Sequence, residues 1–285
     1  MTAVEKVFEY VRYGSLDKIK ALYDVEDIDL NMRNENGVPL IVYATNDFRP
    51  DIVKWLASRG ANVNAADQDG TTALMSAAKQ KSEWMVKDLF EAGAHPNLKD
   101  NNGYTALMHY VNAQIDFYAP SNEKDVKQML HIFYHFGADP CVKNNEGGSV
   151  YPVLKRSLYF DELFTKPYYE EMDEQLYFII NAIVSKNERA AAYLAQTIEN
   201  VNATDKNGYT ALMYAAQQGY VRVMKTLIDR GADLSLLDEL GQTALMHAAD
   251  DWEVAAVRLL LSRGAKVDQQ NKDGQTALMF AVQMN

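Results

Sequence analysis

The chain has 285 residues, of which 48% are hydrophobic and 24% are charged. This is enough apolar material for a packed core, and it excludes a mainly disordered chain. The formal net charge of −11 argues against nucleic-acid binding, which needs clustered cations to displace the counterions of phosphates. A protein partner with a basic patch fits this charge better.

The sequence gives little support for thiol chemistry or for insertion into a membrane. The single cysteine, Cys141, excludes an internal disulfide framework and a zinc site built from several thiolates. No run of about 18 apolar residues occurs, and the N-terminal stretch carries charges where a signal peptide has its apolar segment. We therefore expect no membrane span, no signal peptide and a cytoplasmic location.

Residues 1–33 predict an N-terminal capping unit of two short helices, because their apolar residues recur at a spacing of three and four. One stripe comprises Val4, Val7, Phe8 and Val11, and the other Leu16, Ile19 and Leu22.

A repeat follows the cap. An acidic or amide residue opens each unit, and the steps between these residues are 33, 33, 44, 61, 33 and 33. The opening residues are Asn34, Asp67, Asp100, Asn144, Asp205, Asp238 and Asn271. Such a fixed period is the sequence signature of a solenoid made of stacked supersecondary units.

Each clear unit predicts a hairpin and two helices. A glycine such as Gly208 follows the opening residue and suits a tight turn with positive φ, and Thr210 can then cap a first helix. The pair Ala215 and Ala216 keeps that helix slim for close stacking. A second apolar helix ends at Gly231, the residue type preferred after a helix C-terminus.

These units resemble ankyrin repeats, whose pattern runs from G-x-T-P-L-H-x-A-A to G-A-D-x-N at a period of 33. The resemblance implies an all-α ankyrin-repeat solenoid of helix-turn-helix units with hairpin loops. Five units carry T-A-L-M in place of T-P-L-H, a variant that resembles the repeats of bacterial and protist ankyrin proteins. We expect the methionines of this variant in the core: Met75, Met108, Met213, Met246 and Met279.

The period divides the chain, which we expect to form a single domain over residues 1–285. After the cap of residues 1–33, the predicted units are 34–66, 67–99, 100–143 with an 11-residue insertion (44 minus 33), 144–171, 172–204, 205–237, 238–270 and a terminal half-repeat 271–285. Unit 144–171 is a shortened repeat or an insertion, and we favour the former.

The sequence makes further predictions for two of these units. In the degenerate repeat 172–204, the frame predicts Gln175 at the hairpin tip and 178–184 on the first helix. The half-repeat leaves Leu278, and with it Met279 or Val282, without a second helix to cover them.

We find no pattern for catalysis, a cofactor or a metal. His131 and His135 have the spacing of two metal ligands on one helix face, but solvent-facing residues occupy their equivalent positions in other repeats. His109 and His247 follow the T-A-L-M motif, where other units have unrelated residues. Cys141 has no histidine predictably beside it, so a nucleophile is not expected.

The resemblance implies that a protein partner contacts the concave groove formed by the hairpin tips and the exposed ends of the first helices. The sequence does not give the oligomeric state, for which we expect a monomer. Side chains that vary in this groove inside the fixed frame are free for recognition, and aromatic residues in the central insertions favour hot spots. The candidates are Tyr104, Asn112, Phe117, Tyr118, Tyr168, Tyr169, Tyr209, Gln217, Gln218, Gln242, Asp250 and Asp251. The alternative function is a small-molecule or catalytic site in the tyrosine-rich segment 144–171.

Overall fold

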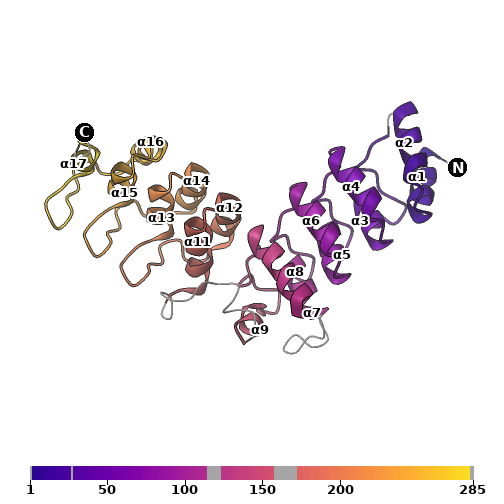
Figure 1. The fold of residues 1–285 in the computed structure, drawn as a ribbon, viewed down its shortest axis with the longest axis horizontal. Coiled ribbons are helices and arrows are strands. Elements are labelled where there is room, and N and C mark those ends of the chain that lie inside the picture. Colours follow the sequence, from indigo (N-terminus) through magenta and orange to yellow (C-terminus); the bar gives the residue numbers. More distant parts are fainter. Residues whose placement is uncertain (1, 27, 114–122, 157–171, 283–285) are drawn as a thin grey trace. The chain divides into compact units, whose positions relative to one another are not determined.

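The computed structural model describes residues 2–26, 28–113, 123–156 and 172–282, and these fall into two compact units (Figure 1). The helices of the first unit are α1 (Ala3–Arg12), α2 (Leu16–Val25), α3 (Leu40–Asn46), α4 (Pro50–Ser58), α5 (Ala73–Lys79), α6 (Glu83–Glu91), α7 (Ala106–Asn112), α8 (Glu123–His135) and α9 (Tyr151–Arg156). Those of the second unit are α11 (Glu174–Val184), α12 (Glu188–Thr197), α13 (Ala211–Gln217), α14 (Val221–Asp229), α15 (Ala244–Asp250), α16 (Val254–Ser262) and α17 (Ala277–Val282).

Helix pairs stack in register within each unit. First helices pack on first helices, in the rows α3, α5, α7 and α11, α13, α15, α17, while second helices form the rows α4, α6 and α12, α14, α16. The predicted alanine pairs make this close approach possible, since Ala77, Ala78, Ala215 and Ala216 are fully buried. The described residues contain no β-strand, so the all-α prediction is confirmed.

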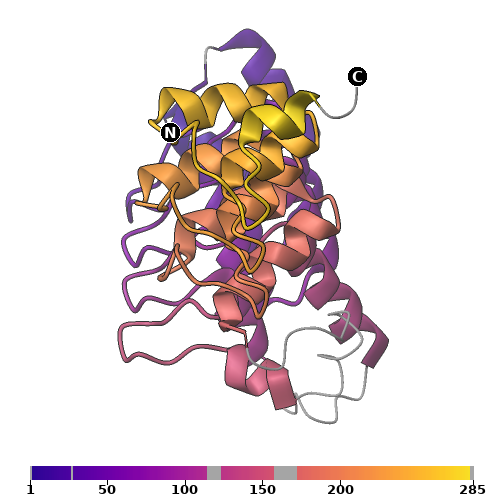
Figure 2. The ribbon, with the colours of Figure 1, turned by 90° about the vertical axis from the view of Figure 1, so that its left-hand side faces the viewer.

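The seven opening residues all form the same hairpin. In each of them the side-chain Oδ1 accepts the backbone N–H groups of the residues two and four positions later, at 2.8–3.1 Å. Loops of this kind project to the same side of the second unit, beside α13, α15 and α17 (Figures 1 and 2). The unit opened by Asn144 has this hairpin although it lacks T-A-L-M.

Neighbouring hairpins are joined by a backbone hydrogen bond. The N–H of Asn145 donates to the carbonyl of Asn102 at 3.0 Å, and Asn101, Glu239 and Lys272 repeat this contact with their preceding hairpins. Gly103 has φ +80°, and a Cβ built on it would lie 2.6 Å from the backbone nitrogen of Asn145. Glycine is thus required here for its backbone conformation and for the closeness of the next hairpin.

The predicted threonine caps are confirmed in four units. The side chains of Thr72, Thr105, Thr210 and Thr243 accept the N–H of the methionine three residues later at 3.2–3.4 Å. The Sδ atoms of Met75 and Met213 lie 3.4 Å from the amide nitrogen of the capping threonine and accept its N–H. Methionine therefore completes a reciprocal cap as well as filling core space.

The methionine prediction is confirmed in four copies and wrong in one. Met75, Met108, Met213 and Met246 are 1–2% exposed, whereas Met279 is 48% exposed. Leu278 and Val282 are exposed as well, as expected for the terminal half-repeat, because no described second helix lies over α17.

The N-terminal cap forms its two helices with one correction. Val7 and Val11 are fully buried and Phe8 and Ile19 nearly so, but Val4 is exposed because it lies in the first turn of α1. Thr2 opens this helix with a reciprocal capping box to Glu5.

The degenerate repeat is a helix pair, α11 and α12, but its first helix starts earlier than predicted. Asp173 caps α11 by accepting the N–H groups of Gln175 and Leu176. Gln175 therefore lies in the first turn of the helix, and its predicted place at a hairpin tip is wrong. Leu194 is buried, which agrees with its alignment to the core leucine Leu227.

None of the helices over the described ranges combines the length and the apolar character needed to cross a bilayer.

Candidate functional site

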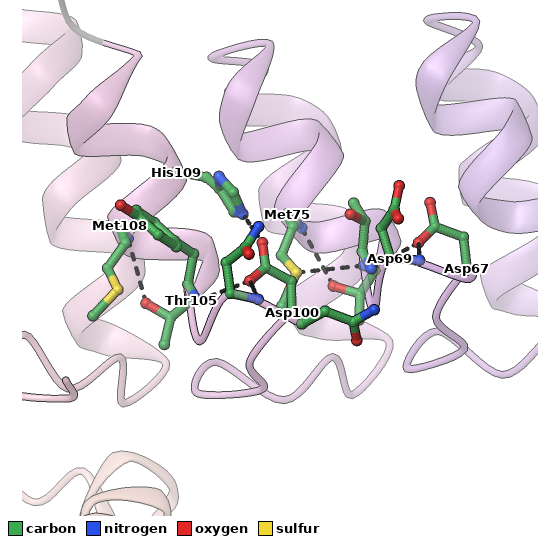
Figure 3. A network of polar contacts seen from close by, with 12 residues as sticks. Asp67, Asp69, Met75, Asp100, Thr105, Met108 and His109 are labelled. Carbon is green, nitrogen blue, oxygen red and sulfur yellow. Dashed lines mark hydrogen bonds and ion pairs between the residues drawn. The ribbon is translucent and has the colours of Figure 1, made fainter. Parts of the chain in front are cut away.

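In three units the opening aspartate also forms a hydrogen bond to the first helix through its second side-chain oxygen, Oδ2. Oδ2 of Asp100 lies 2.8 Å from Nε2 of His109 (Figure 3), and Oδ2 of Asp238 lies 3.0 Å from Nε2 of His247. The hydroxyl of Tyr214 donates to Asp205 in the same way at 2.8 Å. In each pair the partner stands nine residues after the aspartate, so this contact ties the hairpin to the helix that follows it.

Burial shifts the two histidines of these pairs toward the neutral form. Burial lowers the pKa of His247 from its ordinary value of 6.5, against the opposing effects of Asp238, Asp251 and Asp250. Burial, and next the charge of Lys79, lower the pKa of His109, against its bond to Asp100. A neutral imidazole with Nε2–H donates to the carboxylate, which gives both histidines a structural role and agrees with the expectation that they need no catalytic explanation.

Tyr209 lies at the centre of a cluster in the second unit. Its half-buried ring is 4.8 Å from the ring of His247 and 5.2 Å from that of Tyr214. Burial raises the pKa of Tyr209, and the carboxylates of Asp238, Asp205 and Asp251 raise it further. The candidate Tyr209 therefore stands among three negative charges and two packed rings.

Tyr104 holds the same position of its hairpin in the first unit. Its half-buried ring stacks on His109, with centroids 5.5 Å apart and an interplanar angle of 27°. Its backbone N–H is fixed by Asp100 at 2.9 Å. The surroundings differ in charge from those of Tyr209, because Lys79 lies near enough to act on the pKa of His109.

The remaining described candidates lie at the ends of first helices, apart from Gln242 on its hairpin. Asn112, Gln217 and Asp250 are the last residues of α7, α13 and α15, while Gln218 and Asp251 cap the latter two. Gln217 and Gln242 are half-buried, and the other four are exposed: Asn112, Gln218, Asp250 and Asp251.

Four aromatic candidates lie outside the described residues: Phe117, Tyr118, Tyr168 and Tyr169. The same holds for most of the tyrosine-rich segment in which an alternative small-molecule or catalytic site was considered. Of that segment, the structure describes the Asn144 hairpin and α9, where Tyr151 is buried.

The possible metal ligands and nucleophile have ordinary positions. His131 and His135 are exposed on α8, and Cys141 is buried. Within the described ranges, no three His, Cys, Asp or Glu side chains come together as a metal site would require.

Sequence reasoning missed the pairing of hairpin carboxylates with first-helix side chains. The available signal was a histidine or tyrosine nine residues after an opening aspartate, as in His109, Tyr214 and His247. These positions vary between units, and variation alone did not distinguish a side chain that binds a partner from one that braces a hairpin.

Comparison with known families agrees with this architecture. A family model described as ankyrin repeats in three copies matches residues 7–100 and 230–285, and a second, described as ankyrin repeats in many copies, matches residues 194–250. The first alone covers more than half of the chain. The chain belongs to the ankyrin-repeat family, whose members are generally protein-protein interaction modules and typically non-catalytic. A search of the curated proteins finds no match.

Neither family match includes residues 101–193. The structure nevertheless has the repeat's hairpin contact at Asn144 and a helix pair in α11 and α12. Two features of the repeat are therefore present in a part of the chain that neither family model matches.

Proposed function

We propose that the chain is a non-catalytic scaffold or regulator that holds a protein partner with a basic patch against its hairpins and first helices. The observation that carries the proposal is the position of Tyr209, half-buried between two rings and surrounded by Asp205, Asp238 and Asp251. In the first unit, Tyr104 and Asn112 are the corresponding contacts we propose.

The chemistry of this position favours a cation. An arginine or lysine side chain placed over the ring of Tyr209 would gain a cation–π attraction and the attraction of nearby carboxylates. Asp250 and Asp251 are exposed at the end of α15, where they add to the local negative charge. The overall charge of −11 would speed the approach of a basic partner.

Rigidity also supports the proposal. The backbone N–H of Tyr209 is held by Asp205 at 2.8 Å, and its ring packs on side chains that are themselves hydrogen-bonded. A preorganised aromatic residue loses little conformational entropy when a partner binds, which is one reason why tyrosine is frequent in interface hot spots.

Affinity capture from a lysate of the source cells tests the proposal. The wild-type chain is expected to retain one or more proteins with basic surface patches, and Y104A/Y209A is expected to lose most of this signal. Truncation of a hot-spot tyrosine costs on the order of 2 kcal/mol, or about thirtyfold in affinity.

The matched control is Trp84→Ala. Trp84 is a large exposed aromatic residue on the second helix α6, outside the proposed surface. Loss of the same proteins in W84A, or their full retention by Y104A/Y209A, would refute the proposed surface. Retention of no protein above background would count against the binding function itself.

A further inference from the structure

Three hairpin tips of the chain carry an asparagine followed by a glycine. The pairs are Asn36–Gly37, Asn102–Gly103 and Asn207–Gly208. All three asparagines are exposed, and their glycines have φ values of +72°, +80° and +81°. Such a pair is chemically reactive, because glycine has no Cβ to hinder attack of its backbone nitrogen on the asparagine side chain. The hairpins therefore offer three sites for the same modification.

The modification is deamidation through a cyclic imide. The backbone nitrogen of the glycine loses its proton to water and forms a bond to Cγ of the asparagine, and the side-chain nitrogen leaves as ammonia. One water molecule then opens the ring at either of its carbonyl carbons. The product is aspartate or isoaspartate, and neither step needs an oxidant or a reductant. In both products a neutral amide has been replaced by a carboxylate, which changes the charge of the hairpin tip.

The attack on Cγ requires the peptide plane between asparagine and glycine to rotate. In the folded hairpins this plane is held by the N–H of the glycine, which donates to the carbonyl of the residue that opens the unit at 2.9–3.0 Å. Because this bond is present in all three hairpins, it slows the reaction at the three sites alike. A second bond on the same plane would make the sites unequal.

Two of the three planes are held a second time, by the next hairpin. The carbonyl of Asn102 accepts the N–H of Asn145 at 3.0 Å, and that of Asn207 accepts the N–H of Glu239 at 2.8 Å. Among the hydrogen bonds of the described residues, none is formed by the carbonyl of Asn36. A carbonyl oxygen moves with its planar peptide group, so the two bonds resist the rotation that the reaction needs.

The hairpin of Asn36 meets the next hairpin through side chains instead. A Cβ built on Gly37 would lie 3.0 Å from Nε2 of Gln68, whereas backbone atoms of the next hairpin occupy this place at the other two glycines. Arg33 donates to the carbonyls of Gly37 and Ala66 at 2.6 and 2.8 Å. The carbonyl of Gly37 belongs to the following peptide plane, so this bond does not hold the plane that must rotate.

We propose that Asn36 is a modification site of this chain, where the folded protein deamidates faster than at Asn102 and Asn207. The modification places a new negative charge at a hairpin tip of the first unit, and the isoaspartate form also lengthens the backbone by one carbon atom. This proposal does not depend on the proposed function, because the reaction needs only water.

Timed incubation of the folded chain in mildly alkaline buffer tests the proposal. Trypsin places the three sites in separate peptides, 34–54, 100–124 and 207–222, and fragment mass spectra show which asparagine has exchanged its NH2 group for OH. Asn36 is expected to convert at least about threefold faster than Asn102 and Asn207, as the absence of one ordinary hydrogen bond predicts.

Two controls identify the cause of the difference. In urea the hairpins are unfolded, and the three rates are expected to become similar. E239P removes the N–H that binds the carbonyl of Asn207, and proline is favoured at the second position of a β-turn. This variant is expected to raise the rate at Asn207 several-fold and to leave Asn102 unchanged, whereas E239A retains the N–H and should keep the wild-type rates.

Three results would overturn the proposal. They are a rate at Asn36 no higher than at the other two sites of the folded chain, a preference for Asn36 that persists in urea, and an unchanged rate at Asn207 in E239P. If E239P unfolds the second unit, Asn207 reaches its rate in urea, and the comparison of the three sites in the wild-type chain then decides the proposal alone.

Discussion

At the scale of single residues, the opening aspartate or asparagine of each unit has the most regular role. One side-chain oxygen closes the hairpin in all seven units, and in three of them the other oxygen binds a side chain of the first helix. A buried carboxylate with satisfied hydrogen bonds stabilises the loop, whereas an unpaired one would cost free energy. Short polar residues at these positions therefore preserve the hairpin even where the rest of the motif has been lost.

The neutral histidines predict a pH dependence of stability. Since burial lowers the pKa of His247 and of His109 in the folded chain, the unfolded chain binds more protons below the ordinary value of 6.5. The contribution of these two histidines to the free energy of unfolding is therefore fully present well above pH 6.5. It is lost as the pH falls through 6.5 toward their lowered pKa. Urea denaturation at pH 7 and pH 5 is expected to show a smaller difference for H109Q/H247Q than for wild type.

The exposed pair on α8 supplies the control for this prediction. H131Q/H135Q also removes two histidines but leaves the hairpin carboxylates untouched, so it should keep the wild-type difference between the two pH values. An unchanged difference in H109Q/H247Q would show that these histidines are not responsible.

At the scale of elements, the sequence was most informative where a residue type has one physical reason to be present. The glycines of the tips, the capping threonines of four units and the alanine pairs lie where the pattern predicted them. The prediction failed at α11, because Asp173 supplies a cap that the family pattern does not contain. Periodicity alone could not reveal it, since the helix begins earlier than the repeat frame allows.

For the candidate binding surface, the sequence predicted which residues take part but not which side chains surround them. It indicated Tyr209 as a variable residue after a hairpin glycine. The packing of its ring against His247, and the nearness of Asp251, depend on the stacking of successive units. Contacts between residues 38 and 42 positions apart cannot be read from a local pattern.

Hairpin stacking gives a prediction at this scale. Gly103 and Gly147 both have positive φ, but a Cβ at Gly103 would meet the backbone of Asn145, whereas one at Gly147 would have nothing within 4 Å. Gly147→Ala is expected to lower the free energy of unfolding by about 1 kcal/mol through backbone strain alone. Gly103→Ala is expected to cost about 1–3 kcal/mol more, because the next hairpin must move.

Urea denaturation of the two variants measures this difference directly. They lie in consecutive hairpins of the same unit and undergo the same substitution, so backbone strain is matched. Equal destabilisation would mean that the close approach of the hairpins contributes nothing to stability.

At the scale of the whole molecule, family membership and repeat architecture are established, and the use of the surface is our proposal. The sequence predicted a single domain, and the structure is described as two compact units. The predicted division into repeat units stays a prediction. In the middle, aromatic residues replace the motif, and Phe133 and Tyr110 fill core positions there.

The proposed surface has a definite chemistry. The tyrosine cluster of the second unit is polar, negatively charged and braced by hydrogen bonds. A partner held there would bind with a strong dependence on salt, because the attraction between exposed charges is screened within about 10 Å at 0.1 M salt.

The most direct measurement is calorimetric titration of the wild-type chain and Y209A with the partner recovered by capture, at low and at high salt. The proposed function predicts that Y209A binds at least about tenfold more weakly and that wild-type affinity falls as salt rises. Equal affinity of the two chains, unaffected by salt, would contradict a basic partner held at Tyr209.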